Sequence, residues 1–241
     1  MQLDAISVVL RPRSVWEGCD LGVRLLQVTL RPVYRCYWLV AVPLFMLFIA
    51  TLQLADWLPA LLIWLSKPWL DRTILFALSR SLFGQKTSVN DLWASARPVW
   101  ASQWLQTFVR ARLSASRSFT APVVQLEGLE GRERRERTTV LASRHRGAAR
   151  VMTQIFATAE FALFVSLLLV PAWLLPHQAT GGWSIAQLAQ SSALLSTLAY
   201  ACTVCFLEPF YVAAGFGMYI NRRVELEAWD IEQEFRRAFA A

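Results

Sequence analysis

Long uncharged apolar runs dominate the chain and predict helices that cross a membrane. Residues 36–55 form a run of 20 residues without a charged side chain, which is enough to cross a hydrocarbon core of about 30 Å at about 1.5 Å per residue. Residues 151–176 and 184–221 predict two further spans, because each is apolar apart from one carboxylate, Glu160 in the first and Glu208 in the second.

The segment from residue 57 to residue 84 leaves two alternatives open. Its apolar part, residues 57–66, has only ten residues and is too short to span alone. If the helix continues to residue 84, its 28 residues can cross the bilayer with a kink at Pro68, where one backbone hydrogen bond is lost. A re-entrant hairpin is the alternative. Three of the charged side chains in this segment would lie at or below the membrane boundary: Lys67, Asp71 and Arg72.

Amphipathic patterns next to the spans predict helices that lie along the membrane surface. Ser14–Glu17 and Ser88–Asp91 resemble capping boxes, in which a serine and an acidic side chain three residues later satisfy amides at a helix N-terminus. The first helix should end near Pro32, and the second should carry an aromatic face along residues 92–108. Residues 222–241 have apolar side chains at helical spacing and predict a third amphipathic helix.

The composition is typical of a membrane protein, and the ends of the apolar runs divide the chain into five parts. Hydrophobic residues make up 56% of the chain and charged residues 17%, where soluble domains average roughly 45–50% and about 25%. We therefore expect an all-α, polytopic integral membrane bundle with about four spans and amphipathic cytoplasmic helices. The five parts are an N-terminal amphipathic helix (1–35), a first membrane hairpin (36–84), a basic cytoplasmic region (85–150), a second membrane hairpin (151–221) and an amphipathic tail (222–241).

Lysine and arginine are distributed unevenly and predict the orientation. Residues 85–150 hold 12 Lys or Arg against 5 Asp or Glu, whereas the turns at 51–56 and 177–187 contain no Lys or Arg. Basic segments stay on the cytoplasmic side, so we expect a multi-pass protein of the bacterial inner membrane with both termini in the cytoplasm. Within the basic region, residues 114–127 are predicted to be extended, because Pro122 lies in their middle.

The arginines of the basic region have three interpretations. They can hold the topology and attract anionic lipid headgroups, at about 1 kcal/mol per basic side chain near the surface. They can also dock a membrane or cytoplasmic protein partner. Nucleic acid is not expected, because no stacking-aromatic motif, zinc knuckle or helix-turn-helix accompanies them. The candidates for a lipid or partner surface are Arg132, Arg134, Arg135, Arg137, Arg144 and Arg146.

Two carboxylates, Glu160 and Glu208, are predicted to lie at similar depths in the membrane. Counting from Arg150 and Arg222 at about 1.5 Å per residue gives about 15 Å for the first and about 21 Å for the second. An ionised carboxylate at that depth costs on the order of 3 kcal/mol or more, so each should be protonated or paired, and each is a functional candidate. The structural alternative is a tie between helices, because Glu208 precedes Pro209, which weakens its turn by removing a backbone N–H.

The remaining motifs favour helix packing over chemistry. His145 and His177 fall on opposite sides of the membrane in the predicted topology, and the isolated pair Cys202–Cys205 sits in an apolar run, so we expect no catalytic residue, metal site or cofactor. Gly215 and Gly217, beside two alanines, form a small-residue surface that lets helices approach closely in lipid. A contact within the chain is the simpler interpretation of that surface, and a dimer interface is the other.

Three stretches resemble sequences of uncharacterised bacterial inner-membrane proteins: LRPRSVWEGCDLGVRLL, SASRSFTAPVVQLEGLEG and EPFYVAAGFGMYINRRVELEAWDIEQEFRR. The last, with its proline, tyrosine-containing span, basic pair and acidic tail, is also similar to the membrane domain fused to some glycerophosphodiester phosphodiesterases. The first resemblance covers most of the chain, and the second covers about the last 35 residues. Together they imply a multi-helix membrane module and bring no catalytic residue.

Three functional hypotheses follow. The leading one is a non-enzymatic scaffold or accessory subunit of an envelope process, because interfacial surface is abundant and catalytic motifs are missing. The alternative is a small transporter or permease component in which Glu160 and Glu208 line a proton or solute path. Its counter-charges would be Lys67 or Arg72. The third is a lipid-modifying enzyme that works at the cytoplasmic boundary with Asp71 or Glu208.

Overall fold

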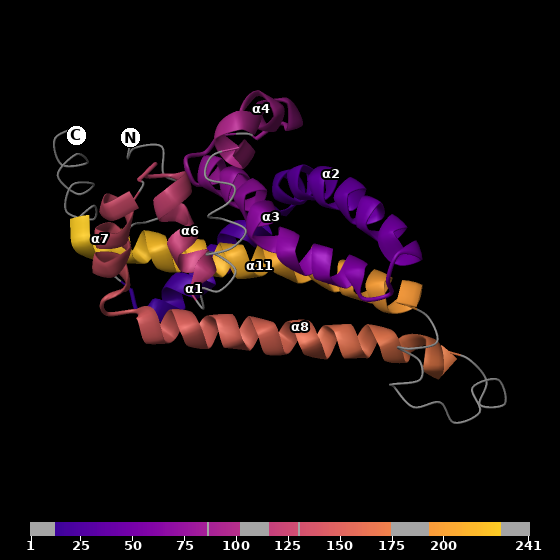
Figure 1. Cartoon of the computed structure of the whole chain (residues 1–241). Helices are drawn as coiled ribbons and strands as arrows, with labels where there is room; N and C mark the ends of the chain where they lie inside the picture. The colour runs from indigo at the N-terminus through magenta and orange to yellow at the C-terminus, as the bar shows by residue number, and fades with distance from the viewer. Residues whose placement is uncertain (1–12, 86, 102–115, 130, 175–192, 228–241) are drawn as a thin grey trace.

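The chain folds into helices in the computed structural model, which describes residues 13–85, 87–101, 116–129, 131–174 and 193–227. Across these ranges no residue forms a strand (Figure 1), so the predicted all-α class is confirmed. The elements are α1 (Val15–Val28), α2 (Leu30–Ile49), the 3-10 helix η2 (Ala50–Gln53), α3 (Leu58–Leu82), α4 (Val89–Ala94), the π-helix η3 (Arg97–Ala101), α6 (Arg117–Gln125), α7 (Gly131–Ala142), α8 (Arg146–Leu174) and α11 (Ala193–Glu227).

Three helices are long and apolar enough to cross a membrane, which agrees with the predicted membrane class. They are Leu30–Gln53, which joins α2 and η2, Arg146–Val170 in α8, and Ala193–Glu227, the whole of α11. The first begins before the predicted start at residue 36. Pro32 does not end the preceding helix, because it lies in the first turn of α2, where a residue without an N–H breaks no helical hydrogen bond.

α3 combines the length of a span with buried charges. It is one continuous helix of 25 residues with Pro68 inside it, and at about 1.5 Å per residue it is about 37 Å long. Three of its charged side chains, Lys67, Asp71 and Arg72, are buried inside the protein. The packing of α3 in the bundle therefore depends on partners for these side chains on other helices.

α11 is the central helix of the bundle. It packs against α1, α2, α3, α6 and α8, and α8 runs antiparallel beside it (Figure 1). From Tyr211 to Arg222 its residues are buried without interruption. Small residues in this stretch, among them Ala214 and Gly215, allow other helices to approach the α11 backbone from several sides.

α1 contacts α11 backbone to backbone. It presents Gly18 and Gly22, four residues apart, to Ala213 and Gly217 of α11, which are also four residues apart. A Cβ atom on Gly22 would lie 1.9 Å from the carbonyl oxygen of Ala213, and one on Gly217 would lie 2.2 Å from that of Gly18. The amphipathic N-terminal helix therefore packs one face on the bundle, while Trp16 on another face is exposed.

Both predicted capping sites begin helices. Ser14 Oγ accepts the backbone N–H of Glu17 at 3.3 Å, and the capping box at Ser88 is complete. The aromatic helix predicted along residues 92–108 is divided between α4 and η3, and its remainder lies in the segment 102–115, outside the described residues. The predicted tail helix also lies outside them beyond Glu227.

The prediction that residues 114–127 are extended is wrong where the structure describes them. Arg117–Gln125 forms α6, with Pro122 inside the helix. Phe119 and Val123 are fully buried, and α6 packs on both α11 and α3. This packing outweighs the hydrogen bond that the proline removes, because local propensity is a weak influence compared with tertiary contacts. Part of the basic region is thus built into the bundle.

Candidate functional site

Four helices bring charged side chains to one buried point, which we call the ion cluster. Its members are Lys67 and Asp71 from α3, Arg117 from α6, Glu160 from α8 and Glu208 from α11. Lys67 and Asp71 are four residues apart and so share one face of their helix. The cluster therefore joins elements that are far apart in the sequence.

Lys67 is the cation that connects α3 to the two long apolar helices. Its Nζ lies 2.6 Å and 2.7 Å from the two carboxylate oxygens of Glu160 and 2.9 Å from Oε2 of Glu208. The lysine side chain is only 3% exposed. Because an ammonium group has three donors, this one residue can satisfy both carboxylates at once.

Arg117 connects α6 to the same point from the other side. Its Nε lies 2.8 Å from Oδ2 of Asp71, and its Nη2 donates to Oε1 of Glu208. The guanidinium also stacks over the ring of Tyr211, with Cζ 5.1 Å from the ring centroid, a cation–π contact. A planar fork of donors suits a position between two carboxylates, which a lysine could not fill in the same way.

Burial makes this pairing necessary. The side chains of Asp71 and Glu208 are each 3% exposed, whereas Glu160 is 23% exposed. An unpaired charge in such surroundings costs several kcal/mol, and that penalty is offset only by opposite charges and hydrogen bonds in good geometry. The cluster thus allows α3 to hold charged side chains inside an otherwise apolar bundle.

Of the five intramembrane candidates predicted from the sequence, the structure brings four together and places one elsewhere. Glu160, Glu208, Lys67 and Asp71 meet in the ion cluster. Arg72 instead donates from Nη1 to the carbonyl oxygen of Val99 at 3.2 Å. The next residue along α11, Pro209, is buried beside Glu208.

Arg117 is the member that sequence reasoning missed. It is one of 12 basic residues between positions 85 and 150, in a stretch predicted to be extended, and 91 residues separate it from Glu208. An uncharged run, residues 118–126, follows it, but residues 98–109 form a longer uncharged run in the same region, so no local signal singles Arg117 out.

The glycines of α11 contact two different helices. A Cβ atom on Gly215 would lie 2.4 Å from Cβ of Ser118 in α6, and one on Gly217 would meet the backbone of α1. Gly215 and Gly217 therefore make close contacts within the chain, on the two sides of α11.

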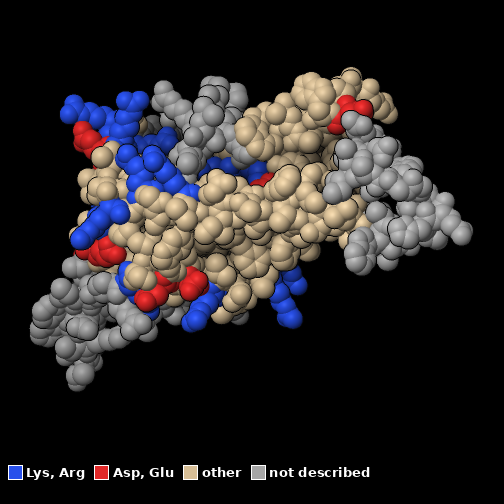
Figure 2. All heavy atoms as spheres, turned by 90° about the horizontal axis from the view of Figure 1, so that it is seen from below, with Lys and Arg blue, Asp and Glu red and all other residues tan. Residues whose placement is uncertain are grey.

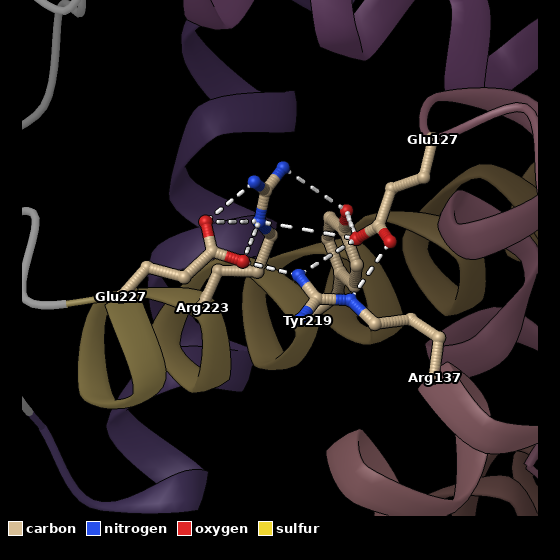
Figure 3. Close-up of polar contacts among 5 residues, drawn as sticks. All are labelled: Glu127, Arg137, Tyr219, Arg223 and Glu227. Atoms are coloured by element: carbon tan, nitrogen blue, oxygen red, sulfur yellow. Dashed lines mark hydrogen bonds and ion pairs between the residues drawn. The ribbon is translucent and has the colours of Figure 1, made fainter.

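A second set of ion pairs, the arginine network, fastens α7 to the C-terminal end of α11 (Figure 3). Glu127, just after α6, accepts hydrogen bonds from Tyr219 at 2.6 Å and from Arg137 Nε at 2.8 Å. Arg137 also pairs with Glu227, which in turn accepts from Arg223 at 3.0 Å. The hydrogen bond to Glu127 raises the pKa of Arg137 above its ordinary value, because the network stabilises the charged guanidinium.

The predicted lipid or partner arginines divide into two kinds. Arg137 is committed to the arginine network, and Arg134 is half-buried. The other four are exposed: Arg132, Arg135, Arg144 and Arg146. Basic side chains gather at the end of the molecule where α7 lies and α8 begins, and the middle of the same face is largely uncharged (Figure 2).

Other candidate chemistry does not assemble in the described part of the chain. No group of three His, Cys, Asp or Glu side chains there is arranged to hold a metal ion. His145, between α7 and α8, lies 4.0 Å from Glu225, and burial lowers its pKa. His177 lies outside the described residues, and Cys202 and Cys205 are free thiols on α11.

Comparisons with protein-family models, with curated proteins and with solved structures found no match. The resemblance to bacterial inner-membrane proteins and to a phosphodiesterase membrane domain therefore stays a prediction from the sequence.

Proposed function

We propose that this protein is a non-enzymatic scaffold or accessory subunit of an envelope process in the bacterial inner membrane. The observation that carries the proposal is the double fastening of the basic region. The ion cluster holds α6 through Arg117, and the arginine network holds Glu127 and α7. A surface that binds a partner reproducibly needs such fixed geometry, because ordering a flexible segment on binding costs free energy.

The proposed topology has four spans, α2, α3, α8 and α11, with both termini in the cytoplasm. α3 is long enough to be the fourth, and its Lys67 and Asp71 are paired inside the protein with Glu160, Glu208 and Arg117, so that lipid would not meet bare charges. The concentration of arginine at the α7 end agrees with that end facing the cytoplasm.

The exposed arginines of α7 and of the start of α8 form the surface that this scaffold would present. Arg132 has a side chain that is 90% exposed, and anionic headgroups near the membrane would attract such side chains by about 1 kcal/mol each. A cytoplasmic or membrane protein with an acidic face suits the same surface. The lipids would hold the platform near the bilayer, and the protein partner would be the client of the scaffold.

Site-specific photocrosslinking tests the scaffold proposal. A photoreactive amino acid at the exposed position Arg135 of α7 should give a discrete crosslinked protein species in cells, which mass spectrometry identifies. The control is the same probe at Phe161 of α8, which is 67% exposed on an apolar face where lipid is the expected neighbour. A protein that purifies in mild detergent as a monomer and gives no protein crosslink at Arg135 would contradict the proposal.

Proton transport is the second candidate, favoured by the way Lys67 bridges a partly exposed carboxylate, Glu160, and a buried one, Glu208. In proteoliposomes with an internal pH-sensitive dye and an imposed potential, the native protein should then conduct protons and Glu208→Gln should not. Glu133→Gln, an exposed change on α7, is the matched control and should conduct like the native protein. Equal proton flux in all three samples and in empty liposomes would contradict proton transport by this protein.

A further inference from the structure

We propose that the ion cluster binds one proton near neutral pH and that Asp71 carries it. The inference goes beyond the scaffold role, because it assigns a bound ligand to the buried site. The first observation is the number of charged groups in the ion cluster. Three carboxylates, on Asp71, Glu160 and Glu208, face two cations, Lys67 and Arg117, in ion pairs of 2.9 Å or less.

With every group ionised, the cluster would hold one uncompensated negative charge. Four of its five side chains are less than 10% exposed, and an unpaired charge in such surroundings is neutralised by taking up a proton. One proton makes the sum zero. In the described part of the chain, the cations in the ion pairs of these carboxylates are Lys67 and Arg117, and the adjacent Arg72 donates to the carbonyl oxygen of Val99.

Hydrogen bonding identifies which carboxylate takes the proton. Both oxygens of Glu160 accept from Lys67, and the oxygens of Glu208 are divided between Lys67 and Arg117. Asp71 differs. Its Oδ2 lies 2.8 Å from Arg117 Nε, but the N–H is not aligned with it, and among the described residues neither Asp71 oxygen has a hydrogen-bond donor.

Among the members of the cluster, a buried carboxylate that receives no hydrogen bond has the highest free-energy cost of burial. Protonation to a carboxylic acid lowers that cost. Protonation removes the charge of Asp71 and gives it an O–H that can donate to a neighbouring carboxylate. The charged or titratable groups that the described contacts place around the site come from five helices: Lys67 from α3, Arg117 from α6, Glu208 and Tyr211 from α11, Glu160 from α8 and Tyr37 from α2.

Infrared spectroscopy detects this proton directly, because a protonated carboxyl group has a C=O stretching band that carboxylates lack. The native protein near neutral pH, in a detergent that contains no ester or carboxyl group, should show the band, and isotopic labelling of the aspartate side-chain carboxyl carbon should shift it. The labelled native protein provides this result without any substitution. Absence of the band, or a shift with labelled glutamate instead, would overturn the assignment.

Two variants locate the proton within the chain. Asp71→Asn, the neutral amide of the same shape, should lose the band, whereas Asp56→Asn, at an exposed aspartate between η2 and α3, should retain it. Persistence of the full band in Asp71→Asn would show that another residue carries the proton. These results do not depend on crosslinking at α7, so the scaffold proposal and the proton site can fail separately.

Discussion

Gly22→Ala should separate α1 from α11 and lower the free energy of unfolding by at least the roughly 1–3 kcal/mol typical of overpacking. The added Cβ atom would lie 1.9 Å from the oxygen and 2.8 Å from the carbon of the Ala213 carbonyl. Both are backbone atoms within a buried helix, so neither can rotate away as a side chain could. Denaturation by a strong detergent in mixed micelles, followed by circular dichroism, measures the change.

Gly147→Ala is the matched control for this prediction. It is the same chemical change in a helix, and beyond the local backbone and the adjacent residues no described atom lies within 4 Å of the Cβ atom that it adds. We expect this variant to unfold like the native protein or slightly later, because alanine favours a helix over glycine. Equal stabilities of the Gly22 and Gly147 variants would contradict backbone contact between α1 and α11.

The thiol of Cys19 gives a local measure of the separation of α1 from α11. It is buried at the α1 contact, and burial raises the pKa of its thiol to about 11. Reactive thiolate is therefore scarce while α1 is docked. With the α11 cysteines Cys202 and Cys205 replaced by serine, Gly22→Ala should increase the rate at which a thiol reagent labels Cys19, and Gly147→Ala should not.

The helices and their approximate limits could be predicted from the sequence because their signals are local. Uncharged runs of sufficient length give α2, α8 and α11, and serine caps give the starts of α1 and α4. Counting by the helical rise predicts similar levels for Glu160 and Glu208, and the structure joins both to Lys67. Each of these predictions needs only the residues of a single segment.

The contacts between distant segments could not be predicted in the same way. Nothing local distinguishes Arg117 from the other arginines of the basic region, and Pro122 argued against the helix that positions it. The spacing of Gly18 and Gly22 was a readable signal, because small residues four apart mark close helix contacts. Its partner pair is far away along the chain, because Ala213 lies 191 residues from Gly22, which it contacts, and Gly217 lies 199 residues from Gly18.

Arg117→Met should destabilise the protein by about 3–5 kcal/mol, the typical loss when one partner of a buried ion pair is removed. The buried carboxylate of Glu208 would lose one of its two cations and retain Lys67 alone. The same detergent titration measures the loss. Arg132→Met is the control, because that side chain is 90% exposed and the ion pair that it makes in the described part of the chain is with Glu136 on the same helix, a contact worth a few tenths of a kcal/mol. Equal stability of the two variants would remove the ion cluster as a determinant of the fold.

Double-mutant cycles then separate the two carboxylates that share Arg117. If Asp71 is already neutral, Arg117→Met combined with Asp71→Asn should be nearly additive. Arg117→Met combined with Glu208→Gln should show a coupling within the range of about 0.5–3 kcal/mol seen for residues in contact. Arg117→Lys should recover only part of the stability, because an ammonium group lacks the fork that reaches both carboxylates. Stronger coupling to Asp71 than to Glu208 would mean that Asp71 is ionised, since the guanidinium interacts far more strongly with a carboxylate than with a carboxylic acid.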